Sequence, residues 1–344
     1  TDWSGFSAEL ERRLAEEDGD PEREMDVMRE AHHAQVFRLL AQDIAGLQTV
    51  ERLADHLTAL ADIIVGKTLE ICWSRLKTRH PLPERAPRFA VIAYGKLGGK
   101  ELGYGSDLDL VFLHDDPEPH VGELYARLAQ RLSTWLSTQT AAGNLFETDS
   151  RLRPNGDAGM LVNSLDAFRD YQLTRAWMWE HQALTRARFC AGDAELGARF
   201  EALRVEILRQ PRDLAKLRED VLTMRQRMLD AHATHREDIF DLKHDPGGLI
   251  DVEFIVQYLI LGHAHAHARL CGNLGNIALL GIAADLDLVP RELADPVRTI
   301  YREYRRTQHA FRLDGIAGSK VERDAYRQQI ETVRALWSHV FDVA

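Results

Sequence analysis

The sequence has little cysteine, and no cysteine spacing that would indicate a structural role. Its three cysteines, Cys72, Cys190 and Cys271, lie far apart and form no C-x-x-C pair among 344 residues. Neither a disulfide framework nor a zinc site is therefore indicated. We expect reduced thiols and a cytoplasmic location.

Long apolar runs and an excess of basic residues are missing too. No segment approaches the roughly 20 apolar residues that cross a bilayer, and residues 1–4 do not resemble the start of a secretion signal. The sequence begins with Thr1 rather than Met, so we expect a piece of a longer polypeptide. Lys and Arg number 43 against 54 Asp and Glu, a formal charge of −11, which argues against nucleic acid as a partner. We expect neither a membrane nor a nucleic acid partner.

What is present is typical of a globular protein with a substantial core, because 45% of the residues are apolar and 28% are charged. Residues 4–80 carry apolar side chains at spacings of three and four, which predicts two or three long helices. Three prolines within residues 81–87 then mark the clearest boundary in the sequence.

Beyond this boundary the pattern changes to short apolar runs. We predict strands at 89–94, 107–114 and 145–149, with a helix at 121–140. After Arg153 we expect no further strand. Seven amphipathic helices are predicted instead, at 164–188, 194–209, 214–235, 249–267, 275–286, 291–313 and 321–341.

These elements predict an α+β fold, in which a small mixed sheet is flanked by helical regions. We divide the sequence into an N-terminal helical linker region (1–80), a catalytic domain (81–190) and a C-terminal helical bundle (191–344).

The loop between the first two predicted strands is rich in glycine. It contains five glycines, Gly95, Gly98, Gly99, Gly103 and Gly105. Glycine accepts positive φ and carries no Cβ, so such a loop lets backbone N–H groups approach phosphate oxygens closely. Lys96 adds a positive charge to the same loop.

The next predicted strand carries two carboxylates. Asp107 and Asp109 alternate with apolar residues, so both side chains should lie on one face, about 6.5–7 Å apart along the backbone. Magnesium prefers oxygen ligands, and two such ions can clamp both ends of a phosphoryl displacement. Asp149 on the third strand would complete the ligand set, and Arg151 and Arg153 continue its face toward the phosphates.

Each of these features has an ordinary structural explanation. An isolated D-x-D in a strand is more often an exposed edge than a metal site. Taken alone, Lys96 would be a solvated surface lysine, and Arg151 and Arg153 would be ion-pair partners. The combination of the glycine loop with three carboxylates favours a site that handles a nucleotide phosphate.

Five segments carry a specific resemblance. Residues 95–99, 106–110, 149–154, 179–184 and 247–254 resemble, in order, the DNA polymerase β-type nucleotidyltransferases. Within that superfamily, the sequence is similar to the adenylyltransferase half of the bacterial glutamine-synthetase adenylyltransferase/deadenylylase family. The resemblance implies a polymerase β-like nucleotidyltransferase core.

The resemblance also implies a set of roles. AMP would pass from ATP to a tyrosine of glutamine synthetase, with two Mg²⁺ ions as cofactors and with the PII signalling protein and glutamine as regulators. Asp107, Asp109 and Asp149 would be the catalytic metal ligands, and Asp149 would also accept the tyrosine proton. The residues expected to bind the nucleotide are Gly95, Lys96, Gly98, Gly99, Ser106, Arg151 and Arg153.

The family has two related halves, one attaching AMP and one removing it by phosphorolysis. We favour the attaching half because residues 102–106 and 176–184 resemble its versions of these segments, and residues 4–80 would then join the halves. Deadenylylation by the same fold and a regulatory nitrogen-signal-binding module stay open as alternatives. Either Gly98-Gly99 or Gly95-Lys96 would hold the triphosphate.

Weaker candidates lie in the C-terminal half. His263 and His267 have the i, i+4 spacing of helical metal ligands, with His265 between them, but no acidic third ligand accompanies them. Asp251 and Glu253 fall on different faces of a helix, so we expect one to be structural. Glu180 and His181 could equally form a buried polar pair.

Overall fold

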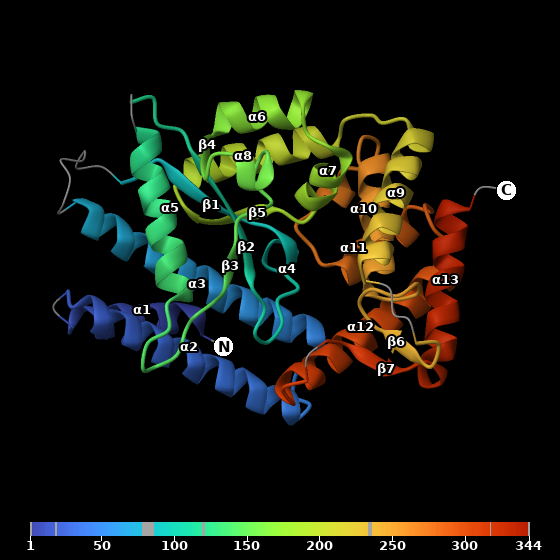
Figure 1. The fold of residues 1–344 in the computed structure, drawn as a ribbon, viewed down its shortest axis with the longest axis horizontal. Helices are drawn as coiled ribbons and strands as arrows, with labels where there is room; N and C mark the ends of the chain where they lie inside the picture. Colours follow the sequence, from blue (N-terminus) through green and yellow to red (C-terminus); the bar gives the residue numbers. More distant parts are fainter. Residues whose placement is uncertain are drawn as a thin grey trace. The chain divides into compact units, whose positions relative to one another are not determined.

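The computed structural model describes residues 2–17, 19–77, 86–118, 121–232, 236–316 and 318–342 (Figure 1). Two compact units emerge, one made of residues 1–175 and 186–203, the other of residues 176–185 and 204–344. The expected α+β class with a small mixed sheet is confirmed. The three-part division of the sequence stays a prediction, and its boundary at residues 80–81 lies outside the described residues.

A five-stranded sheet forms the centre of the first unit. Its strands are β1 (Phe89–Ala93), β2 (Leu108–His114), β3 (Thr148–Asp149), β4 (Val162–Ser164) and β5 (Arg188–Gly192). The order is β3-β2-β1-β5, with β4 also beside β2. β1 is antiparallel to both neighbours, whereas β3 and β4 run parallel to β2. All five residues of β1 are buried, as its unbroken apolar run predicts.

Helices from the N-terminal part share a core with this sheet. They are α1 (Trp3–Ala15), α2 (Pro21–Ile44) and α3 (Val50–Lys77), and α5 (Val121–Ser137) packs with them. α3 contacts α2, α5 and β5. The side chains of Leu108, Leu110 and Phe112 on β2 belong to this core. Because these three side chains point into the core, the alternation along β2 places Asp109 on the opposite face.

The opposite face of β2 carries Val111 and Leu113, which are buried as well. Helix α6 (Leu165–Thr174) contacts β2 and β4, and its Phe168 ring lies 5.9 Å from the ring of Phe200 on α8 (Ala194–Leu208). Ser164 caps the N-terminus of α6, and its hydroxyl accepts a hydrogen bond from the N–H of Ala167.

Three sequence expectations are wrong. The strand predicted at 145–149 is only two residues long, and the helix predicted at 164–188 is divided into α6, α7 (Met178–Leu184) and part of β5. Strands also occur after Arg153, namely β4, β5, β6 (Ile239–Asp241) and β7 (Lys320–Glu322). Strands of three residues are too short to show a period of two. β5 was missed because its pairing with β1 shifts register between Val91 and Ile92, which breaks the alternation.

The second unit is built around one buried helix, α10 (Leu249–His263). Thirteen of its 15 residues are buried, and most of these are apolar, so apolar side chains lie on all sides of the helix. It contacts α7, α9 (Leu214–His232), α11 (Asn276–Asp285), α12 (Arg291–Leu313) and α13 (Arg327–Phe341). The short helices η2 (Ala268–Cys271) and η3 (Arg323–Tyr326) and the antiparallel pair of β6 and β7 complete the unit, while η1 (Gly156–Ala158) belongs to the first.

No helix among the described residues has both the length and the apolar composition that crossing a membrane requires.

A buried arginine joins α2 to the end of α5. Arg29 is fully buried, and its guanidinium donates to the backbone oxygens of Met25 (2.9 Å), Trp135 (3.0 Å), Thr138 (2.5 Å) and Gly143 (2.8 Å). Carbonyls at the C-terminal end of a helix carry partial negative charge, which favours a cation there.

We predict that Arg29→Met destabilises the protein by at least about 3 kcal/mol, because several buried carbonyls lose a charged donor at once. Arg38→Met on the exposed side of the same helix is the matched control. Urea unfolding followed by circular dichroism measures both. Equal midpoints for the two variants would contradict this role of Arg29.

A buried histidine on the same helix makes stability depend on pH. Burial lowers the pKa of His32 to about 3, and its Nδ1 has no hydrogen-bond partner in the described part of the chain. The unfolded chain takes up this proton near the ordinary value of about 6.5, whereas the folded chain does not. The folded state therefore becomes progressively less stable relative to the unfolded state as pH falls from about 6.5 toward 3.

His32→Leu removes this titration. We expect the free energy of unfolding of the variant to rise relative to that of the wild type, by roughly 1.4 kcal/mol per pH unit as pH falls from about 5.5 to 4. Denaturant unfolding at several pH values measures the difference. His33→Leu at the exposed neighbour is the control, and a pH-independent difference for His32→Leu would refute the prediction.

Candidate active site

Three carboxylates come together where β2 begins. Asp109 lies in β2, Asp107 directly precedes the strand, and Asp149 lies in β3. β3 pairs with β2 in parallel register, with Asp149 as the partner of Asp109. Paired residues of neighbouring strands point to the same face, so the predicted third carboxylate is beside the second.

The electrostatics of Asp109 show that these carboxylates act on one another. The pKa of Asp109 is raised to about 6, mainly by burial and then by the negative charges of Asp107 and Asp149. Arg186 and Lys96 lower it, but less strongly. Neighbouring carboxylates that raise one another's pKa in this way are stabilised by a bound cation.

Asp149 is held by the arginine two residues after it. Both carboxylate oxygens accept hydrogen bonds from Arg151 Nε (3.1 and 2.8 Å), and Oδ1 also accepts from the Arg151 backbone N–H (2.8 Å). These bonds keep the pKa of Asp149 below its ordinary value. As the side chains stand, the described residues contain no group of three His, Cys, Asp or Glu arranged to hold a metal ion. The Arg151 side chain itself is 72% exposed.

The glycine loop begins with a short helix, α4 (Gly95–Gly98), directly after β1. Gly95 has a φ of 56°, and a Cβ there would collide with the carboxylate of Asp109. Only glycine therefore allows the turn to lie against this carboxylate. Lys96 follows it and acts electrostatically on Asp109.

Gly98 and Gly99 close the turn. The N–H of Gly98 donates to Tyr94 O (2.9 Å) and that of Gly99 to Gly95 O (3.0 Å). A Cβ on Gly98 would collide with the backbone oxygen of Arg186. Of the two candidate pairs, Gly95-Lys96 is thus the one beside the carboxylates, and Gly98-Gly99 uses its N–H groups within the turn.

Ser106 and Arg153 shape the loops that carry the carboxylates. The Ser106 hydroxyl accepts from the N–H of Gly103 (3.2 Å), just before Asp107. Arg153 is largely buried and donates from Nη1 to the backbone oxygen (2.8 Å) and hydroxyl (3.0 Å) of Ser150. Both residues contact the loops of the site, and their predicted binding of the nucleotide stays a prediction.

Sequence reasoning missed Arg186. Its Nη2 forms a buried ion pair with Glu101 Oε2 (3.0 Å), and its charge lowers the pKa of Asp109. Arg188 is a second missed residue, because its Nε and Nη2 donate to the carbonyl of Leu97 in the glycine turn (3.3 and 3.2 Å). The sequence signal was hidden, since both arginines fell at the end of a predicted helix.

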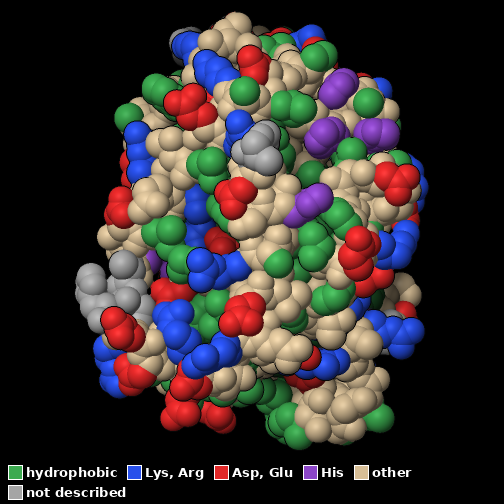
Figure 2. Space-filling view, turned by 90° about the vertical axis from the view of Figure 1, so that its right-hand side faces the viewer, with side chains coloured by type: hydrophobic (Ala, Val, Ile, Leu, Met, Phe, Trp, Pro, Cys, Tyr) green, Lys and Arg blue, Asp and Glu red, His purple; other side chains and the backbone are tan. Residues whose placement is uncertain are grey.

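The three histidines of the C-terminal half do not form the helical pair considered above. Helix α10 ends at His263, so His265 and His267 follow it in a turn. Burial lowers the pKa of His263, and the two neighbouring histidines lower it further. Histidine side chains are visible on the face in Figure 2, but a metal-binding cluster was found nowhere in the described ranges.

The remaining candidates are polar groups inside the second unit. Asp251 is buried and accepts from Arg225, whereas Glu253 accepts from the hydroxyl of Tyr301 (3.3 Å), so the two carboxylates face different partners as expected. Glu180 Oε2 accepts from the backbone N–H of Trp177 (2.8 Å) at the start of α7. His181 beside it is also buried.

Two family models match separate parts of the chain, and longer relatives match nearly all of it. Residues 1–203 match the glutamate-ammonia ligase adenylyltransferase family, and residues 215–336 match the GlnD PII-uridylyltransferase family. The chain is 61% identical over 343 residues to the bifunctional glutamine synthetase adenylyltransferase/adenylyl-removing enzyme of Aromatoleum aromaticum. Proteins of the same name from Chromobacterium violaceum and Burkholderia mallei are 53% and 51% identical over 343 and 346 residues.

These alignments cover 100%, 100% and 99% of this chain but 36%, 38% and 37% of the relatives. The chain therefore spans little more than a third of the length of the curated relatives that it matches.

Asp109 lies near charges of both signs, so removing a negative or a positive neighbour should shift its pKa in opposite directions. We predict that Asp107→Asn lowers the pKa of Asp109 from about 6, because a like charge is removed, and that Arg186→Gln raises it, because a cation is removed. Carboxyl ¹³C NMR titration without divalent cations measures both shifts.

Asp115→Asn, just beyond the other end of β2, is the control for the first variant. The double variant Arg186→Gln/Glu101→Gln controls for the buried Glu101 that the second variant leaves unpaired. Shifts of the same sign in Asp107→Asn and Arg186→Gln would show that the site is arranged differently.

Proposed function

The chain belongs to the glutamate-ammonia ligase adenylyltransferase family, and we propose that it transfers AMP from ATP to a tyrosine hydroxyl of glutamine synthetase, releasing pyrophosphate. The observation that carries this proposal is the parallel register of Asp149 with Asp109, next to Asp107 and behind Gly95. Three carboxylates on one face beside a glycine turn are suited to phosphoryl chemistry.

Magnesium would be held by Asp107, Asp109 and Asp149. The donor set fits, because all are oxygen ligands and because burial, together with the charges of Asp107 and Asp149, raises the pKa of Asp109. When bound, two such ions would neutralise phosphate charge and make the tyrosine hydroxyl more acidic. Magnesium and its number belong to the proposal.

The protein's own residues would position the nucleotide and move the proton. Gly95 lets the turn lie directly against the Asp109 carboxylate, and Lys96 and the exposed Arg151 supply positive charge for a phosphate. Gly98, Gly99, Ser106 and Arg153 would act by holding the loops in place.

Asp149 would take up the tyrosine proton on a carboxylate oxygen. Its lowered pKa keeps it ionised at neutral pH, which is the form that can accept a proton.

Regulation and location complete the proposal. Residues 215–336 match a family named for PII uridylylation, which supports the PII signalling protein as a regulator. Glutamine as a second regulator is implied by the sequence resemblance alone. Three free cysteines agree with a cytoplasmic location.

The relatives' name includes both attachment and removal of AMP. We assign this chain to attachment on the resemblance of residues 102–106 and 176–184 to that half. Removal by phosphorolysis would use the same carboxylates, so an assay must decide between the directions.

We predict that Asp107→Asn and Asp109→Asn each lower AMP incorporation into glutamine synthetase by at least about a thousandfold, a loss of roughly 4 kcal/mol of transition-state stabilisation. Labelled ATP and purified glutamine synthetase give the rate. Asp115→Asn is the matched control outside the site.

Three other results would change the proposal. Activity retained in both variants would remove the assignment of the site. Release of ADP from adenylylated glutamine synthetase and phosphate, without incorporation from ATP, would reverse the direction. A wild-type chain that binds no Mg–ATP in calorimetry would instead be a regulatory module.

A further inference from the structure

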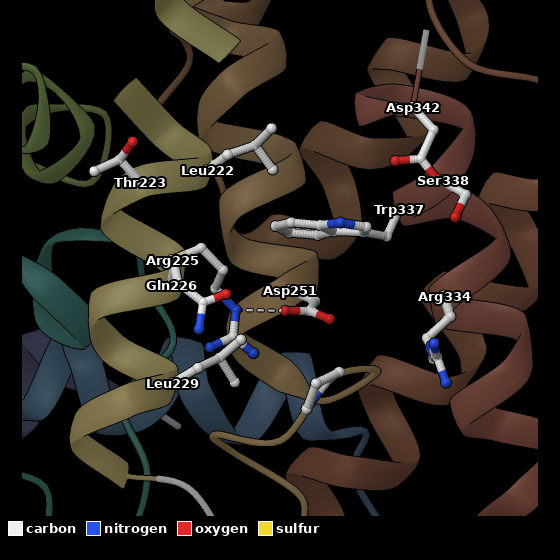
Figure 3. A pocket seen from close by; sticks show the side chains of 11 residues that line it. Leu222, Thr223, Arg225, Gln226, Leu229, Asp251, Arg334, Trp337, Ser338 and Asp342 are labelled. Carbon is white, nitrogen blue, oxygen red and sulfur yellow. Dashed lines mark hydrogen bonds and ion pairs between the residues drawn. The ribbon is translucent and has the colours of Figure 1, made fainter. Parts of the chain in front are cut away.

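A cavity of about 560 Å³ opens in the second unit between α9, α10 and α13 (Figure 3). Its polar lining includes Arg225, Gln226, Asp251, Arg334 and Asp342, with the ring of Trp337 beside them. None of the residues proposed to handle ATP takes part.

Arg225 in this lining has a buried hydrogen-bond donor that lacks an acceptor among the described residues. The residue is 2% exposed, with Nε donating to Asp251 Oδ1 (2.6 Å) and Nη2 to the backbone oxygen of His244 (2.8 Å). Its third nitrogen, Nη1, is equally buried and finds no partner within the described ranges. Buried donors of a charged group are rarely left without an acceptor, because the loss of hydration is not compensated.

Both oxygens of the neighbouring carboxylate already accept a hydrogen bond. Asp251 Oδ1 accepts from Arg225 Nε, and Oδ2 accepts from the N–H of Gly247 (2.7 Å). Asp251 therefore fixes the orientation of the guanidinium and leaves Nη1 for an acceptor from outside.

The other walls indicate which acceptor suits the cavity. Arg334 on α13 adds a second, exposed cation, and Trp337 presents its ring to the cavity in Figure 3. Asp251 and Asp342 line the same space, so a dianion would meet more repulsion than a monoanion. A single carboxylate attached to a flat or apolar group matches these walls.

We propose that this cavity binds a small organic molecule with one carboxylate, which accepts a hydrogen bond from Arg225 Nη1 and pairs with Arg334, while its carbon skeleton contacts Trp337. The site is separate from the residues that define the proposed function, so either can fail without the other.

Benzoate is the first probe, with acetate as the smaller carboxylate. Benzamide lacks the charge, and inorganic phosphate carries more of it. We expect saturable benzoate binding in calorimetry of the whole chain, with benzamide and phosphate at least about tenfold weaker, as loss of one charge-assisted hydrogen bond implies.

Variants locate the binding. Arg225→Lys keeps a cation for Asp251 but lacks Nη1, and should weaken benzoate by at least about tenfold. Trp337→Leu should weaken benzoate several-fold more than acetate, because the ring contact is lost. Arg327→Gln, exposed on the same helix α13 and bonded to Asp324, is the matched control.

Circular dichroism establishes whether each variant folds. If Arg225→Lys does not, the exposed Arg334→Gln together with Trp337→Leu decides the question. Lack of saturable benzoate binding, phosphate binding as tight as benzoate, or benzoate affinity unchanged in the folded variants would each overturn the proposal.

Discussion

The parallel pairing of β3 with β2 sets Asp149 beside Asp109, and the proposed chemistry depends on this short contact. β3 has only two residues, so its own ladder provides few hydrogen bonds. Leu108 donates to Glu147 O (2.9 Å), and the N–H groups of Leu145 and Phe146 donate to Leu136 O at the end of α5. The strand is thus positioned largely by the helix that precedes it.

That helix is held in turn by Arg29. Its guanidinium bonds to carbonyls at the end of α5 and to Gly143 O in the loop that leads to β3. A buried cation surrounded by carbonyls is stable only in a narrow geometry, since each N–H has a fixed direction. The position of Asp149, a proposed catalytic carboxylate, is therefore linked to a helix that the sequence places in the preceding region.

Much of this site could be predicted because it follows simple periods. Asp107 and Asp109 alternate with core residues of β2, and that alternation alone fixes their face. Arg186 and Arg188 could not be found in this way. Arg188 begins the bulged strand β5, where the period of two fails, and Arg186 lies two residues before it. Their partners are 85 and 91 residues away in the sequence.

From the sequence, the glycines of the loop are all expected to allow close approach to phosphate, whereas in the structure they have different roles. Gly95 is needed for space beside Asp109, but Gly98 is needed because the backbone of Arg186 passes close to it. A composition rich in glycine does not distinguish approach to a ligand from approach to another strand. Only the tertiary pairing of β1 with β5 makes that distinction.

The proposed direction of AMP transfer depends on different residues from those that bind the phosphates. Attachment and phosphorolysis both displace an oxygen at the same phosphorus, and the carboxylates that stabilise this displacement serve either reaction equally. In the proposed reaction, Asp107, Asp109 and Asp149 would therefore set the rate but would not select the acceptor. Selection between a tyrosine hydroxyl and a phosphate must come from the groups that bind the acceptor, which is why the carboxylate geometry supports nucleotidyl transfer more strongly than it supports one direction.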